Sequence, residues 1–411
     1  MAAFLLLAVG AVVSRRPDAL LNAQFFVEDG RQWYAGAYNI GWDALVTPYS
    51  GYLVTFSRLV AAVTVFFPLL WAPTVFFIAA LAVQVLPVAY LLSSRLDSSF
   101  PSLTARMALA LLYVGVPNTP ELDVNLTNAM WHLTIVAFLI IWSLPPRTRL
   151  LRGIEYALVG VSALSGPFGI FLLPTAAMVW WRRRSVWHRN LFAIFAVGDV
   201  IQLIVIVTHF HQRLTEPLGA GLVAFCKIFG GEVILASFLG RAPLWQEDTL
   251  LPISITVLAL VLIAWAAWRG PDILRLWILF AALSFAAALW SPGVVISRVP
   301  AWVSLMSPSV GGRYYLFPIL AWFGVLMWLA AKLSRGWAKR RSLRTLRLAA
   351  AEVVIVGLVA GVANGWEYTG EPNLHWSHQV ARFHDAANGA HVAFPVNPDN
   401  GQYTMILIKH G

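Results

Sequence analysis

Long apolar runs, separated by short polar segments, occupy most of this chain of 411 residues. A bilayer with a hydrocarbon core of about 30 Å requires roughly 17–25 apolar residues for each helical span. Because a helix satisfies its own backbone hydrogen bonds in lipid, the runs predict an all-α polytopic membrane protein with about 11 transmembrane helices. The predicted spans cover residues 2–13, 71–94, 103–117, 128–144, 153–164, 167–181, 190–209, 250–268, 274–290, 313–331 and 348–366.

Two apolar stretches contain helix-breaking residues in their middle. Ser165-Gly166-Pro167 divides residues 153–181, which predicts a tight hairpin of two short spans. The run 222–240 contains Gly230-Gly231 together with a lysine and Glu232. We interpret this run as a re-entrant or interfacial segment on the outer side, where protein has to cover it.

Clusters of lysine and arginine give the predicted orientation. Cytoplasmic loops carry an excess of these residues, so we place three clusters in the cytoplasm: residues 147–152, 182–189 and 332–347. The N-terminus is then cytoplasmic, a first outer loop covers residues 15–70, and the tail 367–411 is extracytoplasmic. Arg15 and Arg16, at the start of the outer loop, go against this rule.

Composition excludes several other classes. The chain is 59% hydrophobic and 12% charged, a balance that soluble globular domains do not have. Its net charge of +10 sits in clusters between apolar runs, as expected for orientation in a membrane, so we exclude nucleic-acid binding. The single cysteine, Cys226, excludes an intramolecular disulfide and a cysteine metal cluster.

The tail after residue 366 has its own pattern. Residues 391–396 and 402–408 are strand-like, and the turn residues 397–401 separate them, which predicts a small β-hairpin. A segment this short cannot build an independent core, so we expect it to pack on the outer face. The predicted organisation is a transmembrane catalytic domain over residues 1–366 and an extracytoplasmic tail over 367–411.

The most informative polar segment covers residues 25–34, where Glu28 and Asp29 stand side by side among aromatic residues. An acid at the edge of a membrane is a functional candidate because its burial is unfavourable. Partial desolvation would raise its pKa toward the range that a general base needs. The alternative is an acid at a helix N-terminus, favoured by the helix dipole. Which carboxylate acts stays open, although Gly30 after Asp29 would permit close approach of an acceptor.

A second polar cluster lies at the predicted outer mouth of the fourth span, in residues 121–132. Asn125, Asn128 and His132 have the spacing of one helical face. Amides, an imidazole and the neighbouring Trp131 suit sugar hydroxyls and ring stacking. The alternative is helix capping beside an aromatic belt residue.

An arginine on the predicted outer face is a third candidate. Arg313 lies in Gly311-Gly312-Arg313-Tyr314-Tyr315 at the outer start of a span, so orientation does not explain it. It could bind a lipid-linked phosphate with Tyr314 beside it, and the alternative is snorkelling toward headgroups. Arg298 in the same outer loop is a weaker candidate.

One acid, Asp199, lies in the middle of a predicted span. It could belong to a proton path, but a structural hydrogen bond between helices is favoured because no second acid at that depth continues a relay. The tail histidines His375, His378 and His384 match no strong metal pattern, so no metal site is predicted. The sequence leaves open whether a divalent cation takes part.

Taken together, these motifs resemble the GT-C class of polytopic glycosyltransferases, and more closely a group of bacterial membrane proteins of that type. The resemblance spans most of the chain and rests on short segments: residues 26–30, 48–52, 125–131, 166–167 and 312–314. It implies a catalytic carboxylate in the first outer loop and a donor in which the sugar is bound to a polyprenyl phosphate.

The resemblance also implies roles for individual residues. The catalytic base would be Asp29 or Glu28, and the donor phosphate would meet Arg313 and Tyr314. From their own chemistry rather than from the resemblance, the residues expected to bind the sugar or the acceptor are Asn125, Asn128, Trp131, His132, Tyr49 and Tyr52. The expected protein is an inverting hexosyl- or pentosyltransferase of the bacterial plasma membrane, surrounded by membrane lipids. It would act at the extracytoplasmic side on a glycan, lipid or protein acceptor.

Two functions from other classes compete with this interpretation. A flippase for lipid-linked sugars, or another transporter, would depend on Asp199 and would be expected to show structural repeats. We find no internal repeat in the sequence. A noncatalytic assembly protein would depend neither on Asp199 nor on the acidic pair at residues 28–29.

Overall fold

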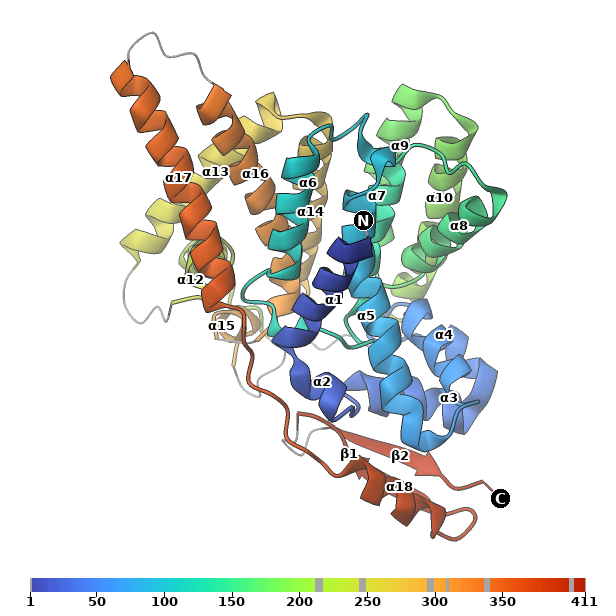
Figure 1. Cartoon of the computed structure of the whole chain (residues 1–411). Helices are drawn as coiled ribbons and strands as arrows, with labels where there is room; N and C mark the ends of the chain where they lie inside the picture. Colours follow the sequence, from blue (N-terminus) through green and yellow to red (C-terminus); the bar gives the residue numbers. More distant parts are fainter. Residues whose placement is uncertain are drawn as a thin grey trace. The chain divides into compact units, whose positions relative to one another are not determined.

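The computed structural model describes residues 2–210, 217–243, 249–293, 299–307, 310–335, 341–398 and 403–410 (Figure 1). Arg298, the predicted turn residues 399–401 and part of the third basic cluster lie outside these residues. The described part is mostly helical, with one antiparallel pair of strands. The predicted all-α membrane class is confirmed at this level, because several helices are long and apolar enough to cross a membrane.

The chain forms two compact units, which we describe separately. Unit 1 comprises Met1–Tyr90, Leu122–Gln212 and Tyr368–Gly411. Unit 2 comprises Leu91–Glu121 and Arg213–Glu367, so the chain leaves unit 1 and returns to it twice.

The long helices of unit 1 form its apolar part: α1 (Ala2–Arg15), α5 (Ala72–Leu91), α7 (Ala129–Trp142), α8 (Arg149–Ala163), α9 (Phe168–Arg183) and α10 (Val186–Thr208). Helices α7 to α10 pack on one another. Side-chain caps begin two of them: Thr148 accepts a hydrogen bond from the Leu151 N–H, and Ser185 accepts one from the His188 N–H.

The break predicted between α8 and α9 is present. Gly166 adopts a φ of +84°, which glycine tolerates, and its N–H donates to the Leu53 carbonyl at 2.9 Å. Gln202 of α10 donates to the carbonyls of Leu53 and Gly166 at 3.1 and 3.0 Å. The break therefore attaches the helical hairpin to the first loop.

The first loop of unit 1 folds into short elements: α2 (Pro17–Leu21), η1 (Asp29–Tyr34), α3 (Ala35–Ile40), η2 (Gly41–Val46), α4 (Thr55–Thr64) and η3 (Leu69–Trp71). The tail adds α18 (Trp376–His384), β1 (His391–Pro395) and β2 (Thr404–Ile408), with Phe394 opposite Met405 in an antiparallel register.

Aromatic side chains join the loop to the tail. The Phe25 ring lies 5.3 Å from Trp376 and 5.1 Å from Phe76 of α5. Trp376 in turn lies 5.5 Å from Phe394 of β1, and both rings are buried. The tail thus has no core of its own and completes the core of the first loop.

Unit 2 contains η4 (Ser94–Leu96), α6 (Leu103–Val114), α11 (Leu222–Cys226), η7 (Lys227–Leu235), α12 (Ala236–Leu239), α13 (Leu250–Arg269), α14 (Asp272–Trp290), α15 (Ala301–Leu305), η8 (Gly312–Tyr315), α16 (Leu316–Arg335) and α17 (Arg341–Asn364). The short η5 (Pro120–Leu122) stands at the boundary between the units.

The glycine pair at 230–231 does not interrupt its helix. Elements α11, η7 and α12 continue through it without a gap, and the stretch Leu222–Leu239 is apolar and long enough to cross a membrane. A Cβ on Gly230 would lie 2.8 Å from the Pro252 carbonyl oxygen, so this glycine lets α13 approach closely. The re-entrant interpretation therefore loses one of its grounds, the glycine break, and whether this stretch crosses the membrane stays a prediction.

Six helical stretches of the described residues have the length and hydropathy of a membrane span: Leu69–Leu91, Val186–Thr208, Leu222–Leu239, Leu250–Arg269, Asp272–Trp290 and Gly312–Leu333. Shorter apolar helices are Ala2–Arg15, Leu103–Val114, Ala129–Trp142 and Leu348–Asn364. A predicted span thus corresponds to a helix in each case, while the number that cross stays a prediction.

Candidate functional site

Asp29 is the first residue of η1, a π-helical turn in the first loop of unit 1. Such turns are rare in proteins, and those that occur are often at functional sites. The carboxylate does not cap its own helix. It reaches across to the segment before α7, where it accepts hydrogen bonds from the Thr127 N–H at 2.7 Å, the Thr127 hydroxyl at 2.8 Å and the Leu126 N–H at 3.2 Å.

Asp29 is 4% exposed, and this burial raises the pKa of its carboxyl group to about 7. The hydrogen bonds from Thr127 and Leu126 favour the charged form and act in the opposite direction, but burial is the larger effect. No ion pair between Asp29 and a basic side chain occurs within the described part of the chain. Asp29 can therefore exchange a proton near neutral pH.

The backbone on both sides of this contact is strained. Val27 has a φ of +38° and Val124 a φ of +51°, although both are β-branched residues for which positive φ is an outlier. Each such residue costs on the order of 1–3 kcal/mol and persists only where its surroundings require it. Val27 N–H donates to the Asn397 carbonyl of the tail at 2.7 Å, and Val124 N–H donates to Gln84 Oε1 at 2.9 Å. Contacts from the tail and from α5 thus enforce the geometry around Asp29.

Glu28 has a different environment from its neighbour. It is half-buried and accepts a hydrogen bond from the Tyr49 hydroxyl at 2.8 Å. Tyr49 and Tyr52 face each other through two backbone hydrogen bonds around Ser50 and Gly51, which both have positive φ as in a type I′ turn. Glu28, predicted as a candidate base, and Tyr49, predicted to bind the sugar or the acceptor, thus lie in contact.

Trp33 contacts the partners of both carboxylates, Thr127 and Tyr49, and also a buried arginine. Its indole N–H donates to the Thr127 hydroxyl at 3.3 Å, and its ring lies 5.2 Å from Tyr49. The Arg58 guanidinium lies 5.1 Å from the centre of the same ring. Arg58 is 3% exposed, its Nε has no hydrogen-bond partner among the described residues, and burial lowers its pKa to about 10.

Gly30 is closely packed between the first loop and the tail. A Cβ there would lie 3.0 Å from Phe25 Cβ and 3.1 Å from Val396 of the tail. The glycine therefore allows the tail to pack against the loop, and the approach of an acceptor at this position stays a prediction.

The polar cluster before α7 is connected, but not as one helical face. Asn125 lies outside the helix, which begins at Ala129, so the expected helical spacing does not apply. Its Oδ1 accepts hydrogen bonds from the Asn128 N–H at 2.9 Å and the Asn128 side chain at 3.2 Å. His132 contacts the Leu122 carbonyl at 3.1 Å.

Trp131 is 3% exposed, and its ring lies 4.4 Å from Phe168. It packs inside the helices rather than presenting a free face to a sugar. Asn125, Asn128 and His132 are buried as well, so these residues shape the segment that holds Asp29.

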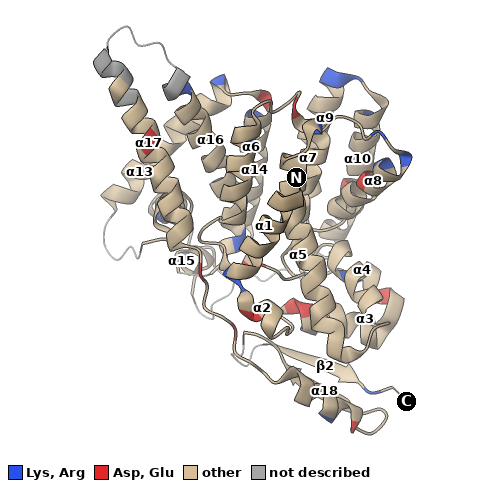
Figure 2. Ribbon diagram, in the orientation of Figure 1, with Lys and Arg blue, Asp and Glu red and all other residues tan. Residues whose placement is uncertain are grey.

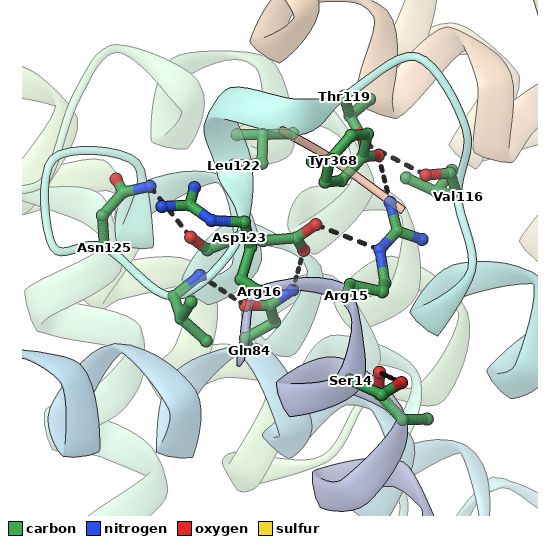
Figure 3. Close-up of polar contacts among 12 residues, drawn as sticks. Ser14, Arg15, Arg16, Gln84, Val116, Thr119, Leu122, Asp123, Asn125 and Tyr368 are labelled. Atoms are coloured by element: carbon green, nitrogen blue, oxygen red, sulfur yellow. Dashed lines mark hydrogen bonds and ion pairs between the residues drawn. The ribbon is translucent and has the colours of Figure 1, made fainter. Parts of the chain in front are cut away.

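Asp123 organises a second buried network in unit 1 (Figure 3). It pairs with Arg15 at 3.1 Å and accepts a hydrogen bond from Gln84, while Arg15 also contacts the Tyr368 hydroxyl at the start of the tail. Arg16 pairs with Asp18 at 2.9 Å. The two arginines that went against the charge rule are thus structural partners of acids.

Arg313 lies in unit 2 and is already paired. Its Nη1 donates to Glu121 Oε2 at 2.7 Å, and its backbone N–H donates to Glu121 Oε1 at 2.6 Å. Its Nη2 donates to the Gly293 carbonyl at 2.8 Å, and its guanidinium lies 4.8 Å from the centre of the Tyr314 ring. Arg313 and Tyr314 therefore lie in a site whose positive charge is balanced, and their contact with a donor phosphate stays a prediction.

Asp199 of α10 is buried, and both of its carboxyl oxygens are without a hydrogen-bond partner among the described residues. A Cβ on Gly169 of α9 would lie 2.2 Å from Asp199 Oδ1, so a glycine makes room for the acid. The structural hydrogen bond expected for Asp199 is thus absent from the described residues.

Metal ligands do not gather in the part of the chain that the structure describes: no group of three or more His, Cys, Asp or Glu side chains is placed to hold an ion. The rings of His375 and His378 stack at 5.9 Å.

Basic residues mark one end of unit 1. Figure 2 shows lysine and arginine at the ends of α8, α9 and α10 that point away from α2, α3 and α4. The first loop of unit 1 and the tail lie at the other end of the same helices (Figure 1).

The described fold defines an all-α membrane protein. Neither a scan against known protein families nor a search of curated proteins finds a match to this chain.

Sequence reasoning missed several residues of the site. Thr127 stands within a segment already singled out, and only its partner was unknown. Arg58 was visible as a lone cation in an amphipathic stretch. Asn397 gives no local signal, because its contact with Val27 joins distant parts of the sequence.

Proposed function

We propose that this protein is an inverting glycosyltransferase of the membrane, which moves a sugar from a polyprenyl phosphate to an acceptor hydroxyl. The observation that supports this function best is the environment of Asp29. A buried carboxyl with a pKa of about 7, held by three donors and unpaired with any basic side chain of the described residues, has the properties of a general base at neutral pH.

In the proposed reaction, Asp29 takes the proton of the acceptor hydroxyl as its oxygen attacks the anomeric carbon of the donor. A new carbon–oxygen bond forms, the bond from that carbon to the phosphate oxygen breaks, and polyprenyl phosphate leaves with the electron pair. General-base catalysis of this kind contributes about 10²–10⁴-fold to the rate. Glu28, bound to the Tyr49 hydroxyl, assists in positioning the acceptor.

The donor phosphate requires a cation, and Arg58 suits this role better than Arg313. The charge of Arg313 is balanced by Glu121, whereas none of the ion pairs in the described residues involves Arg58. A buried guanidinium without a counter-ion is unfavourable unless an anion completes it. Arg58 also belongs to the amphipathic α4, which exposes Leu59, Val63 and the nearby Phe66 as an interfacial helix does.

The proposed site faces the extracytoplasmic side of a bacterial plasma membrane. This orientation is supported by the basic residues at the opposite end of α8, α9 and α10 (Figure 2). A donor sugar on a polyprenyl chain would then approach from the outer leaflet.

The test is sugar transfer by Asp29→Asn and Glu28→Gln, assayed at equal protein level in membranes with a polyprenyl-phosphate sugar. We expect Asp29→Asn to lose 10²-fold or more and Glu28→Gln to lose less. Near wild-type transfer by both variants would contradict the mechanism.

A second candidate function, a lipid-linked-sugar flippase or transporter, is favoured by Asp199. An acid in the middle of an apolar helix with no partner in the described residues could bind and release a proton. Asp199→Asn separates the two functions, because a transporter would lose transport while the proposed enzyme would keep transfer within about threefold.

A further inference from the structure

A small cavity of about 30 Å³ lies beside Asp29, and residues of unit 1 alone line it. One water or one hydroxyl group needs about 10–15 Å³, so the cavity has room for a small polar group. Its walls come from α2, the segment around Asp29 in the first loop, the start of α5, the segment around Asp123 and the tail.

The charged groups around the cavity are mostly acidic. Asp18, Asp29, Asp123 and Glu371 contribute carboxyl groups, and Arg16 is the basic residue among the lining residues. Arg16 is already held by Asp18 at 2.9 Å and Asp123 by Arg15 at 3.1 Å, so Asp29 and Glu371 are the lining carboxyl groups that no ion pair of the described residues balances. An anionic ligand would therefore meet like charges, whereas a neutral or cationic one would not.

An unsatisfied acceptor from the tail independently indicates a ligand. Asn397 lines the cavity and is 2% exposed, and its Oδ1 has no hydrogen-bond partner among the described residues. Its Nδ2 donates to the Pro372 carbonyl at 3.1 Å, and a carbonyl can only accept, so the orientation of the amide is fixed. A buried acceptor of this kind needs a donor, and leaving it unpaired costs stability.

We propose that this cavity binds the reacting end of the acceptor, that it recognises a hydrogen-bond donor such as a sugar hydroxyl or an ammonium group, and that it rejects anionic acceptors. The proposal rests on the proposed function in one respect, the assignment of Asp29 as the base that takes the acceptor proton. Asn397 Oδ1 would accept a hydrogen bond from a hydroxyl or ammonium group of the acceptor, while the Asp29 carboxylate receives the proton of the reacting hydroxyl.

The acceptor and the donor phosphate would therefore bind to groups of opposite charge. The acidic cavity disfavours the donor phosphate, which is left to a cation elsewhere in the protein. The tail is then part of the acceptor site, because Asn397 reaches the cavity only while its backbone pairs with Phe25 and Val27.

The experiment measures binding without a donor, so that it does not depend on catalysis. The full-length protein in nanodiscs is titrated with three probes by ligand-observed NMR: methyl glucoside, methyl glucosaminide and methyl glucuronide, which are neutral, cationic and anionic. We expect the glucuronide to bind at least about tenfold more weakly than the other two. Equal or tighter binding of the glucuronide overturns the proposal.

Two variants of Asn397 test the acceptor atom. Asn397→Ala should weaken the neutral probe about five- to tenfold, and Asn397→Asp should improve the ammonium probe over the neutral one by about fivefold or more. The matched control is Asn39→Ala, since Asn39 bonds the backbone of Ile406 and Ile408 but does not line the cavity. Wild-type binding of all three probes by both Asn397 variants overturns the proposal.

Failure of this inference can be told apart from failure of the proposed function. If Asp29→Asn abolishes transfer but the three probes bind alike, the acceptor assignment is wrong and the glycosyltransferase proposal stands. If Asp29→Asn keeps transfer while the probes discriminate by charge and require Asn397, the cavity is a site for neutral or cationic polyols, and the mechanism is wrong.

Discussion

Asp29 in unit 1 and Arg313 in unit 2 were predicted as parts of one site, and their environments are opposite. Arg313 is held by both oxygens of Glu121 and by the Gly293 carbonyl. Asp29 is held by neutral donors, and its burial raises its pKa to about 7. A charge that has its counter-ion already contributes to structure, whereas a buried group kept without one is available for a ligand or a proton.

The same contrast separates two arginines. Arg58 is more deeply buried than Arg313 but lacks a carboxylate partner among the described residues. The described part of the structure therefore keeps Arg58 of unit 1 without a counter-ion, although this is unfavourable, and gives Arg313 of unit 2 a carboxylate partner. Because of this difference, mutation of Arg58 is more informative than mutation of Arg313.

The largest expected effect is on stability at high pH. The pKa of Asp29 is about 7 when folded and about 4 in an unfolded chain, so folding favours the protonated form. Its stability contribution is complete below pH 4 and is lost as pH rises through 7, a change of about 4 kcal/mol. Asp29→Asn should therefore be clearly more stable than wild type at pH 8 and close to it at pH 4, measured by thermal unfolding.

The matched control is Asp43→Asn, in the same loop but exposed. It should leave the difference between the two pH values unchanged. If Asp29→Asn destabilises the protein equally at both pH values, Asp29 is not the uncompensated group that the comparison requires.

The next effect separates the two arginines in the transfer assay. Arg58→Gln should raise the KM for the donor about 10–100-fold, because a charge-assisted contact to phosphate is lost. Arg313→Gln should change this KM by less than about threefold. A larger rise in KM for Arg313→Gln than for Arg58→Gln would show that Arg313, and not Arg58, binds the donor phosphate.

A smaller effect concerns the ion pair of unit 2. Glu121→Gln removes the charge that balances Arg313, whose side chain is 24% exposed, and should cost about 1–2 kcal/mol of stability. Asp272→Asn is the control, because its pair with Arg275 is 40% exposed on both sides and should contribute little. Equal shifts in Tm for the two variants would show that the Glu121 pair is an ordinary surface contact.

Periodicity and length predict the helices well, because apolar runs of this length have no other stable form in lipid. The break at Gly166 was predictable for the same reason, since glycine followed by proline ends a helix locally. The continuous helix through Gly230 was not, because that glycine serves contact with α13, which no local pattern encodes.

The candidate site was predictable only in part. Asp29 and residues 125–128 were recognised as separate motifs, yet nothing local indicates that Thr127 donates to Asp29. Asn125 was placed on a helical face because its spacing fits one, whereas the helix begins at Ala129. Contacts made through the tail, such as that of Asn397 with Val27, depend on the whole fold and have no signature in the sequence.

The smallest expected effect tests how Asp29 is tuned. If Asp29 is the base, kcat/KM should rise with pH along a limb centred near 7. The Thr127 hydroxyl favours the charged carboxylate, so Thr127→Val, which keeps the shape, should raise the pKa and move the limb upward by about half to one pH unit.

Thr55→Val is the control, because Thr55 donates to the Leu164 carbonyl and does not contact Asp29. Its limb should stay in place. At pH values well above the limb, Thr127→Val should recover most of the wild-type rate, because its carboxylate is then fully charged. A limb that does not move in Thr127→Val, or that moves to lower pH, would mean that the titration belongs to another group. The difference between the environments of Asp29 and Arg313 would then concern stability and not catalysis.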